Sequence, residues 1–220
     1  MNNPWKNLPE TQPYILPSDY ELIDFENRNL SHDTIIQHHV LPEPYIGDPN
    51  APIILLNLNP GYADEDVAFY NQKHVRILWE KNIHHSSMDY PFWFLDPSLD
   101  VEIGGARWWQ TKLKEPIKTA GLQKVANRVC CIEWFPYHSR KFARLNKIID
   151  SQNYSFHLVQ KAISQKAIVI VMRSEKLWFE SIQELRSYKH IYRLNSPQNV
   201  AISRKNCPTG FPLIETILMS

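Results

Sequence analysis

Two polar side chains lie where apolar stretches of the sequence end. Asn59 follows the apolar run at residues 53–56, in a turn that Pro60 and Gly61 restrict, and Glu133 lies near the end of a second apolar run. Apolar runs of this kind are typical of central parallel strands that are covered on both faces. Because ligands bind just beyond the carboxyl ends of such strands, these two residues are the first candidates for chemistry, although Asn-Pro-Gly is also an ordinary turn sequence.

Glu133 is the more informative of the two, since its surroundings are the apolar sequence VCCIEWF. A carboxylate in such surroundings costs free energy unless it is paired with a cation or neutralised by a proton. A buried salt bridge and a proton-donating carboxyl are both consistent with this pattern. Asn59, in contrast, can orient a water molecule but cannot deprotonate it.

The elements that must position these residues alternate along the chain. Strands are expected at about 53–56, 128–134, 167–172 and 190–194. Helices are expected at 19–27, 33–39, 64–82, 105–114, 154–164, 175–186 and 212–218. Alternating strands and helices predict an α/β fold, a three-layer α/β/α sandwich with a mostly parallel four-stranded central sheet.

The whole chain, 1–220, is expected to be a single domain. Residues 1–17 contain four prolines and are expected to form an irregular N-terminal arm. Residues 83–103 form a long irregular loop rich in aromatic residues, and loops of this length are usually functional or mobile.

Composition excludes several classes of function. The formal net charge is only +1, so any contact with nucleic acid must come from local patches. Three cysteines without a C-x-x-C pair indicate neither a disulfide framework, a zinc site nor an iron–sulfur cluster, and no histidine motif for a metal is present, so no cofactor is expected. Because no transmembrane run or signal peptide is visible, a cytoplasmic location with no membrane partner is expected, and no obligate protein partner is evident.

The turn at residues 58–61, Leu-Asn-Pro-Gly, resembles the first motif of the uracil-DNA glycosylase superfamily. The similarity is to the mismatch-specific and single-strand-selective branches, where the motif reads G-[IM]-N-P-G, and Asn57 stands where those have glycine. Residues 196–199, Ser-Pro-Gln-Asn, resemble part of the second motif, H-P-S-P-x-N. Leu194 falls on the histidine of that motif, which donates to the departing base, so Asn195 or His138 would have to supply the donor.

Glu133 falls where the single-strand-selective enzymes carry an asparagine that reads the uracil edge, if Pro136 is placed on the proline of their following turn. A carboxylate can accept from the exocyclic amine of cytosine but clashes with a carbonyl oxygen of uracil. If burial raises its pKa, a protonated Glu133 could also donate to the ring nitrogen of cytosine. The substitution therefore favours cytosine or a modified cytosine over uracil.

The resemblance implies a monofunctional DNA glycosylase that flips out a base and hydrolyses its N-glycosidic bond, with DNA as its partner. Asn59 would orient the attacking water, and Glu133 would act on the base. The residues expected to bind the base are Asn57, Pro60, Gly61, Tyr62, Phe92, Trp93, Phe135, His138 and Asn195. The residues expected to contact DNA are Ser196, Gln198, Asn199, Arg204, Lys205 and Arg140.

The aromatic rings of the 83–103 loop have two interpretations: they pin the loop to the core, or one of them stacks on an extruded base. A bulky modified cytosine, of the kind found in phage genomes, is the preferred substrate because of Glu133 and this insertion. The alternatives are a uracil or mismatch glycosylase in which Glu133 is structural, and a non-catalytic DNA-binding module on the same fold.

Overall fold

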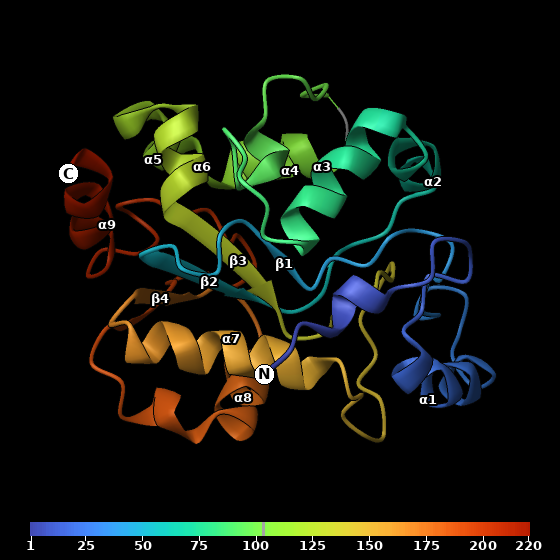
Figure 1. Cartoon of the computed structure of the whole chain (residues 1–220). Coiled ribbons are helices and arrows are strands. Elements are labelled where there is room, and N and C mark those ends of the chain that lie inside the picture. Colours follow the sequence, from blue (N-terminus) through green and yellow to red (C-terminus); the bar gives the residue numbers. More distant parts are fainter. Residues whose placement is uncertain (103) are drawn as a thin grey trace.

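The computed structural model describes residues 1–102 and 104–220 (Figure 1). Within this part of the chain, five strands form one sheet in the order β1-β3-β2-β4-β5. The strands are β1 (Tyr45–Ile46), β2 (Ile53–Asn57), β3 (Val129–Glu133), β4 (Ile168–Val171) and β5 (Ile191–Arg193). β3, β2, β4 and β5 run parallel, and β1 pairs antiparallel with β3.

The α/β class is confirmed, but the expectation of a mostly parallel four-stranded sheet needs correction, because the sheet is mixed and has a fifth strand. β1 contains only two residues, which pair with Ile132 and Cys131. A two-residue strand has no periodicity to detect, and the prolines at 42 and 44 give its sequence the character of a loop.

Helices lie on both sides of the sheet, with α3 to α6 on one side and α7 and α8 on the other (Figure 1). The α-helices are α1 (Pro17–Asn27), α2 (Glu65–Tyr70), α3 (Lys73–Ile83), α4 (Gly104–Lys112), α5 (Lys114–Ala120), α6 (Leu122–Arg128), α7 (Gln152–Ser164), α8 (Glu175–Ser181) and α9 (Phe211–Met219). The 3-10 helices are η1 (Pro4–Asn7), η2 (Trp93–Leu95) and η3 (Gln183–Arg186). Over residues 1–102 and 104–220, every helix is too short or too polar to span a bilayer.

Three predicted helices differ from the structure, and two observed helices, α5 and α6, lie where no helix was expected. The helix expected at 175–186 is divided into α8 and η3, because Ile182 has extended backbone angles. The single helix expected at 64–82 is divided into α2 and α3, because Gln72 has extended backbone angles. Residues 33–39 form turns and an isolated bridge rather than a helix. The Asn27 side chain explains this, since it accepts from the Ile36 amide at 2.9 Å and donates to the Ile36 carbonyl at 3.1 Å, which replaces helical hydrogen bonds.

The aromatic residues of the predicted 83–103 loop belong to the core. Phe92, Trp93 and Phe94 are at most 2% exposed, and Trp93 and Phe94 stack with their ring centroids 3.9 Å apart. These contacts bury a large apolar area and fix the loop against the sheet-covering helices. Ile103, the last residue of that predicted loop, lies outside the described residues.

The register of the sheet places Asn57 and Glu133 side by side. Asn57, the last residue of β2, lies opposite Glu133, the last residue of β3. The segments that follow these strands stay together, because the Phe135 amide donates to the Leu58 carbonyl at 2.8 Å. Since β3 and β4 lie on opposite sides of β2, the carboxyl end of β2 is also the point where the strand order reverses, which is where α/β sheets bind ligands.

The turn that connects β1 to β2 depends on Gly47, which has φ +105° and lies against β3. A Cβ atom at this position would lie 2.6 Å from the Val129 carbonyl oxygen. We expect Gly47→Ala to reduce the free energy of unfolding by roughly 3 kcal/mol, from backbone strain and steric overlap together. Gly121→Ala is the control, because Gly121 has φ +83° but a Cβ atom there would meet nothing within 4 Å, so roughly 1–2 kcal/mol of strain alone should be lost.

Urea unfolding of the two variants measures the difference. Equal losses at the two positions would contradict the role of the contact with Val129.

Candidate functional site

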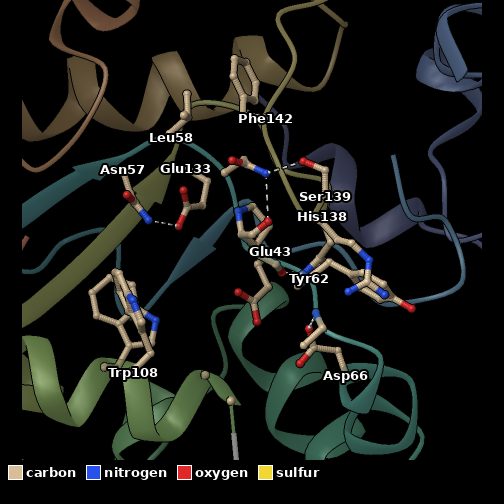
Figure 2. A pocket seen from close by; sticks show the side chains of 18 of the residues that line it. Glu43, Asn57, Leu58, Tyr62, Asp66, Trp108, Glu133, His138, Ser139 and Phe142 are labelled. Carbon is tan, nitrogen blue, oxygen red and sulfur yellow. Dashed lines mark hydrogen bonds between the residues drawn. The ribbon is translucent and has the colours of Figure 1, made fainter. Parts of the chain in front are cut away.

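A cavity of about 580 Å³ opens at the carboxyl ends of β2, β3 and β4 (Figure 2). Its walls come from the turn after β2, from α2 and α4, and from the segment at 138–142 that follows β3. Eight of the residues predicted from the sequence line it: Asn57, Asn59, Pro60, Gly61, Tyr62, Glu133, His138 and Arg140. The ends of the first two predicted strands therefore do supply one common cavity.

Asn57 and Glu133 form a buried pair at the inner end of the cavity. The Asn57 Nδ2 donates to Glu133 Oε1 at 2.9 Å, and the two side chains are 6% and 1% exposed. Cys131 Sγ lies 3.8 Å from the same Oε1. No ion pair in the described chain includes Glu133, so the salt-bridge interpretation of this carboxyl is wrong.

One atom of each partner in this pair has no hydrogen bond within the described chain. These atoms are Asn57 Oδ1 and Glu133 Oε2, both of them buried. Leaving a buried polar atom unpaired costs about 1–3 kcal/mol, and native proteins rarely keep two such atoms together without a reason. Both residues line the cavity, so a bound ligand is the natural partner for these atoms.

The protonation state of Glu133 decides which ligand would fit. Burial raises the pKa of this carboxyl to about 8, and the hydrogen bonds from Asn57 and Cys131 and the charge of Arg173 only partly oppose the effect. At neutral pH the carboxyl is therefore mostly protonated. Glu133 then offers an O–H donor beside the acceptor Oδ1 of Asn57, which matches a ligand that presents an acceptor next to a donor.

Asn59 is held in a fixed orientation at the side of the cavity. Its Nδ2 donates to the Pro60 carbonyl at 2.9 Å and to Ser139 Oγ at 3.0 Å. Among the described residues, nothing donates to its Oδ1, which is left to accept a hydrogen bond from water or from a ligand. The side chain can therefore position a nucleophilic water, but it has no capacity to take up a proton.

His138 cannot supply the donor that the second motif lacks. Its Nδ1 lies 2.6 Å from the Gly61 carbonyl oxygen and its Nε2 lies 3.0 Å from the Leu41 carbonyl oxygen. Burial lowers the pKa of this imidazole to about 4 although the two carbonyl contacts oppose the shift, so at neutral pH the ring is uncharged and only one of its nitrogens donates. Both ring nitrogens face the backbone, and the histidine connects the turn after β2 to the segment before β1 instead of contacting a ligand.

Three of the aromatic residues predicted to bind a base lie away from the cavity. Phe92, Trp93 and Phe135 are at most 2% exposed and do not line it. Their rings pack in the core, as shown by Phe92 against Trp109 with centroids 4.8 Å apart. The prediction that these three rings bind a base is therefore wrong. Packing in the core buries more of the surface of each ring than a position in the cavity wall would.

Half-buried aromatic rings do line the cavity, and they come from other segments. These are Tyr62, Trp108 and Phe142. Figure 2 shows Trp108 and Phe142 on two sides of the Asn57–Glu133 pair and Tyr62 farther away, beyond Glu43. The Arg140 guanidinium lies 5.1 Å from the centre of the Tyr62 ring, and Lys112 lies 5.7 Å from that of Trp108. Each of these two rings therefore has one face supported by a cation and can present another surface to a planar ligand.

The segment that resembles the second motif forms a self-contained loop outside the cavity lining. Asn206 organises it: its Nδ2 donates to the carbonyls of Asn199 and Ala201 at 2.7 and 2.9 Å, and its Oδ1 accepts from the Ser196 amide at 2.8 Å. The residues predicted here are Asn195, Ser196, Gln198, Asn199, Arg204 and Lys205, and none of them lines the cavity. The expectation that Asn195 binds the base in the same site as Asn59 is therefore wrong.

Arg204 is fixed by contacts within the protein. Its guanidinium forms an ion pair with Glu215 and lies 5.6 Å from the centre of the Phe211 ring, and its backbone amide donates to Glu115 at 2.8 Å. These contacts hold the side chain along α9. The guanidinium expected to contact DNA is therefore already paired within the protein.

The sequence interpretation missed several residues of the cavity. They are Glu43, Asp66, Tyr70, Trp108 and Ser139. Glu43 is 6% exposed and accepts a hydrogen bond from the Tyr70 hydroxyl, and Asp66 accepts from the Ala63 amide at 2.7 Å. Glu43 did carry a signal, because a carboxylate between two prolines in VLPEPYIG resembles the apolar setting of Glu133.

Metal coordination does not explain these carboxyl groups. In residues 1–102 and 104–220, no three His, Cys, Asp or Glu side chains come together in a way that could hold a metal ion.

Comparison of the chain with protein-family models, with curated proteins and with solved structures gives no match.

The raised pKa of Glu133 makes stability depend on pH. Between pH 4.5 and about 8 the folded protein keeps a proton that the unfolded chain has released, so this residue lowers the free energy of unfolding as the pH rises. We expect Glu133→Gln to become more stable relative to the wild type over this range, by up to about 1.4 kcal/mol per pH unit. Urea unfolding at pH 5, 6.5 and 8 measures the difference.

Glu10→Gln, at an exposed position of the N-terminal arm, controls for the general effect of removing a carboxylate. A stability difference between wild type and Glu133→Gln that is the same at all three pH values would show that Glu133 is ionised in the folded protein.

Proposed function

We propose that this chain is a monofunctional DNA glycosylase, related to the uracil-DNA glycosylase superfamily, which excises cytosine or a bulky modified cytosine and leaves an abasic site. The observation that carries the proposal is the Asn57–Glu133 pair, which directs an unpaired acceptor and an unpaired carboxyl oxygen to a cavity with aromatic walls. The resemblance of residues 58–61 to the first motif of that superfamily supports it, because Asn59 lies in the same cavity.

The hydrogen-bonding pattern of the pair matches one edge of cytosine. Asn57 Oδ1 can accept from the exocyclic amine, while the protonated Oε2 of Glu133 can donate to the adjacent ring nitrogen. Uracil presents a carbonyl oxygen in place of that amine, and two acceptors would then face each other. With uracil bound, these buried polar atoms would lack hydrogen-bond partners. Unpaired buried polar groups of this kind discriminate strongly between two ligands of similar size.

The same pair can assist cleavage. As the N-glycosidic bond breaks, its electrons move into the base, and the Glu133 carboxyl can transfer its proton to the ring nitrogen that it contacts. Asn59 Oδ1 can hold a water molecule for attack on the sugar carbon, because its Nδ2 is fixed by Pro60 and Ser139. Protonation of the leaving base and placement of the water together replace the missing histidine of the second motif.

The size and lining of the cavity favour a base that carries a substituent. At about 580 Å³ it lies within the range of pockets that hold drug-sized ligands, roughly 300–1,000 Å³, and a bare pyrimidine would leave much of it unfilled. Trp108, Phe142 and Tyr62 supply surfaces for stacking, as single-strand binding and base flipping require.

Contacts to the DNA backbone would come from basic residues at the cavity mouth. Arg140 and Lys141 line the cavity but form ion pairs with Asp64 and Asp33, and Arg173 is exposed and carries a charge beside β4. Phosphates would have to compete with Asp64 and Asp33 for the first two cations, so we expect binding that weakens strongly with added salt.

An assay for abasic sites tests the reaction. Oligonucleotides that contain one uracil, cytosine, 5-methylcytosine or 5-hydroxymethylcytosine, single-stranded or in duplexes, are incubated with the protein and cleaved with alkali. We expect product from the cytosine series, a loss of about 100-fold in kcat for Asn59→Ala because the water loses its position, and wild-type activity for Asn153→Ala on the exposed side of α7. Product from uracil with none from any cytosine would contradict the proposed specificity.

Glu133→Gln separates the proposed substrate from the first alternative. Because the introduced amide could still accept from Asn57 but has no carboxyl proton to transfer, we expect about 100-fold slower excision of cytosine bases. In a uracil or mismatch glycosylase with a structural Glu133, this variant would leave base preference unchanged.

A non-catalytic DNA-binding module is the second candidate, and one observation favours it. His138 faces backbone carbonyls with both ring nitrogens and Asn195 lies outside the cavity, so the usual donor to the departing base is missing. If the wild type and Asn59→Ala both bind these oligonucleotides and neither forms abasic product, the protein is a DNA-binding module and not a glycosylase.

A further inference from the structure

The reaction proposed above leaves one polar atom of the base without a partner. When the N-glycosidic bond of cytosine breaks, its electron pair spreads from the bonded ring nitrogen onto the neighbouring carbonyl oxygen, O2. A donor at this oxygen stabilises the transition state more than the ground state, because the charge develops there only as the bond breaks. In the proposed complex, Asn57 and Glu133 contact the amine and the other ring nitrogen, N3, so O2 needs a third group.

The order of the strands determines where that third group must lie. Asn57 ends β2 and Glu133 ends β3, and the next strand on that side of the sheet is β1. In cytosine the amine, N3 and O2 follow one another along one edge of the ring. A base whose amine faces Asn57 and whose N3 faces Glu133 therefore directs O2 toward β1 and away from β4.

Glu43 is the side chain that comes next in this order. It lies two residues before β1, is 6% exposed and lines the cavity together with Asn57 and Glu133. Its backbone is tied to the end of β3, since the Glu133 amide donates to the Pro44 carbonyl at 3.0 Å and the Glu43 amide donates to the Pro136 carbonyl at 2.9 Å. Neighbouring strands lie about 4.8 Å apart, so side chains from these three positions can converge on one base. Figure 2 shows them in the order Asn57, Glu133, Glu43.

The Glu43 carboxyl offers a proton instead of accepting one. Burial raises its pKa well above the usual range; the hydrogen bond from Tyr70 opposes this shift, and the charges of Glu133 and Asp66, when ionised, add to it. As with Glu133, the carboxyl is therefore protonated at neutral pH. The Tyr70 hydroxyl donates to Oε1, which leaves the proton on Oε2, an atom that no group in the described chain hydrogen-bonds.

We infer that Glu43 donates a hydrogen bond to the O2 atom of the excised base and stabilises the charge that forms there. The inference rests on the glycosylase reaction proposed above. The bond between the sugar carbon and the base breaks with its electron pair going to the base, N3 receives the Glu133 proton, and Glu43 keeps its own. The water oxygen bonds to the sugar carbon and releases one proton to solvent, which balances the proton that Glu133 gave.

Loss of the Glu133 proton strengthens the donor next to it. The negative charge then left on Glu133 raises the pKa of Glu43 further, so Glu43 stays protonated while the base departs. The two carboxyls thus have different roles, one as a proton donor to N3 and the other as a hydrogen-bond donor to O2.

Other polar groups of the cavity are less suited to O2. Both ring nitrogens of His138 face backbone carbonyls. Arg173 follows β4, which neighbours β2 on the side away from β3, so it lies toward the amine of the base. Asp66 holds the start of α2, where its Oδ2 accepts from the Ala63 amide at 2.7 Å.

The test compares two substitutions of Glu43 with a matched change outside the cavity. Glu26, on α1, is also 6% exposed and does not line the cavity. We expect Glu43→Leu, which removes the donor, to lower kcat by about 100-fold with little change in KM. Glu43→Gln should keep kcat within about tenfold of the wild type, because its amide can donate to O2 and accept from Tyr70. Glu26→Leu should keep the wild-type kcat, and thermal unfolding verifies that each variant is folded.

A change in the substrate isolates the contact itself. Oligonucleotides carry the base that the wild type excises fastest, either with O2 or with sulfur in its place, and sulfur is a weak acceptor. Sulfur also alters the leaving base, but this intrinsic effect is the same for every variant. We expect the ratio of kcat for the oxygen base to kcat for the sulfur base to be at least about tenfold smaller for Glu43→Leu than for the wild type, because both changes remove one interaction. Glu43→Gln and Glu26→Leu should keep the wild-type ratio.

The outcomes separate the inference from the reaction on which it rests. If the wild type forms no abasic product from any oligonucleotide, the glycosylase reaction and the role of Glu43 are both refuted. If the wild type is active and Glu43→Leu has the wild-type ratio, only the role of Glu43 is refuted, whatever the change in kcat. A loss of about 100-fold or more in Glu43→Gln would also refute that role, since this variant retains a donor, and this measurement applies even if Glu43→Leu does not fold.

Discussion

Across the β2–β3 ladder, the amide of Asn57 holds one oxygen of Glu133 and leaves the other oxygen open to the cavity. This contact exists because the strand register places the last residues of two central strands opposite each other. The Trp178 indole fixes the position further, as its Nε1 donates to the Asn57 carbonyl at 2.8 Å from the other side of the sheet. A carboxyl that would otherwise be costly to bury thus becomes a neutral, oriented group, and the remaining cavity residues are arranged around it.

The four parallel strands and five of the α-helices (α1, α4, α7, α8 and α9) could be predicted because their apolar patterns are strong. Residues 53–57 and 129–133 contain continuous apolar runs, and the parallel arrangement follows from the helices between them. β1 could not be predicted, because pairing with Ile132 and Cys131 is a long-range contact that leaves no pattern in two residues. The Asn27 side chain that prevents a helix around Ile36 is likewise a tertiary effect that overrides local propensity.

From the sequence, only those residues of the site that lie at or just after the end of a strand could be predicted. Asn59 and Glu133 could be found in this way, whereas Glu43 and Trp108 enter the cavity from a proline-containing loop and from a partly exposed position on a helix. The prediction that residues after β5 belong to the site was wrong for a related reason. They follow a strand at the same edge of the sheet, but Asn206 ties them into their own loop, and sequence alone does not reveal that internal network.

The floor of the cavity belongs to the most protected part of the molecule. β2 and β3 are central strands whose residues are at most 6% exposed, so we expect their amide hydrogens to exchange with solvent only when the central sheet itself opens. A ligand bound to this pair would therefore slow exchange throughout the central sheet, because its binding energy is added to global rather than local stability.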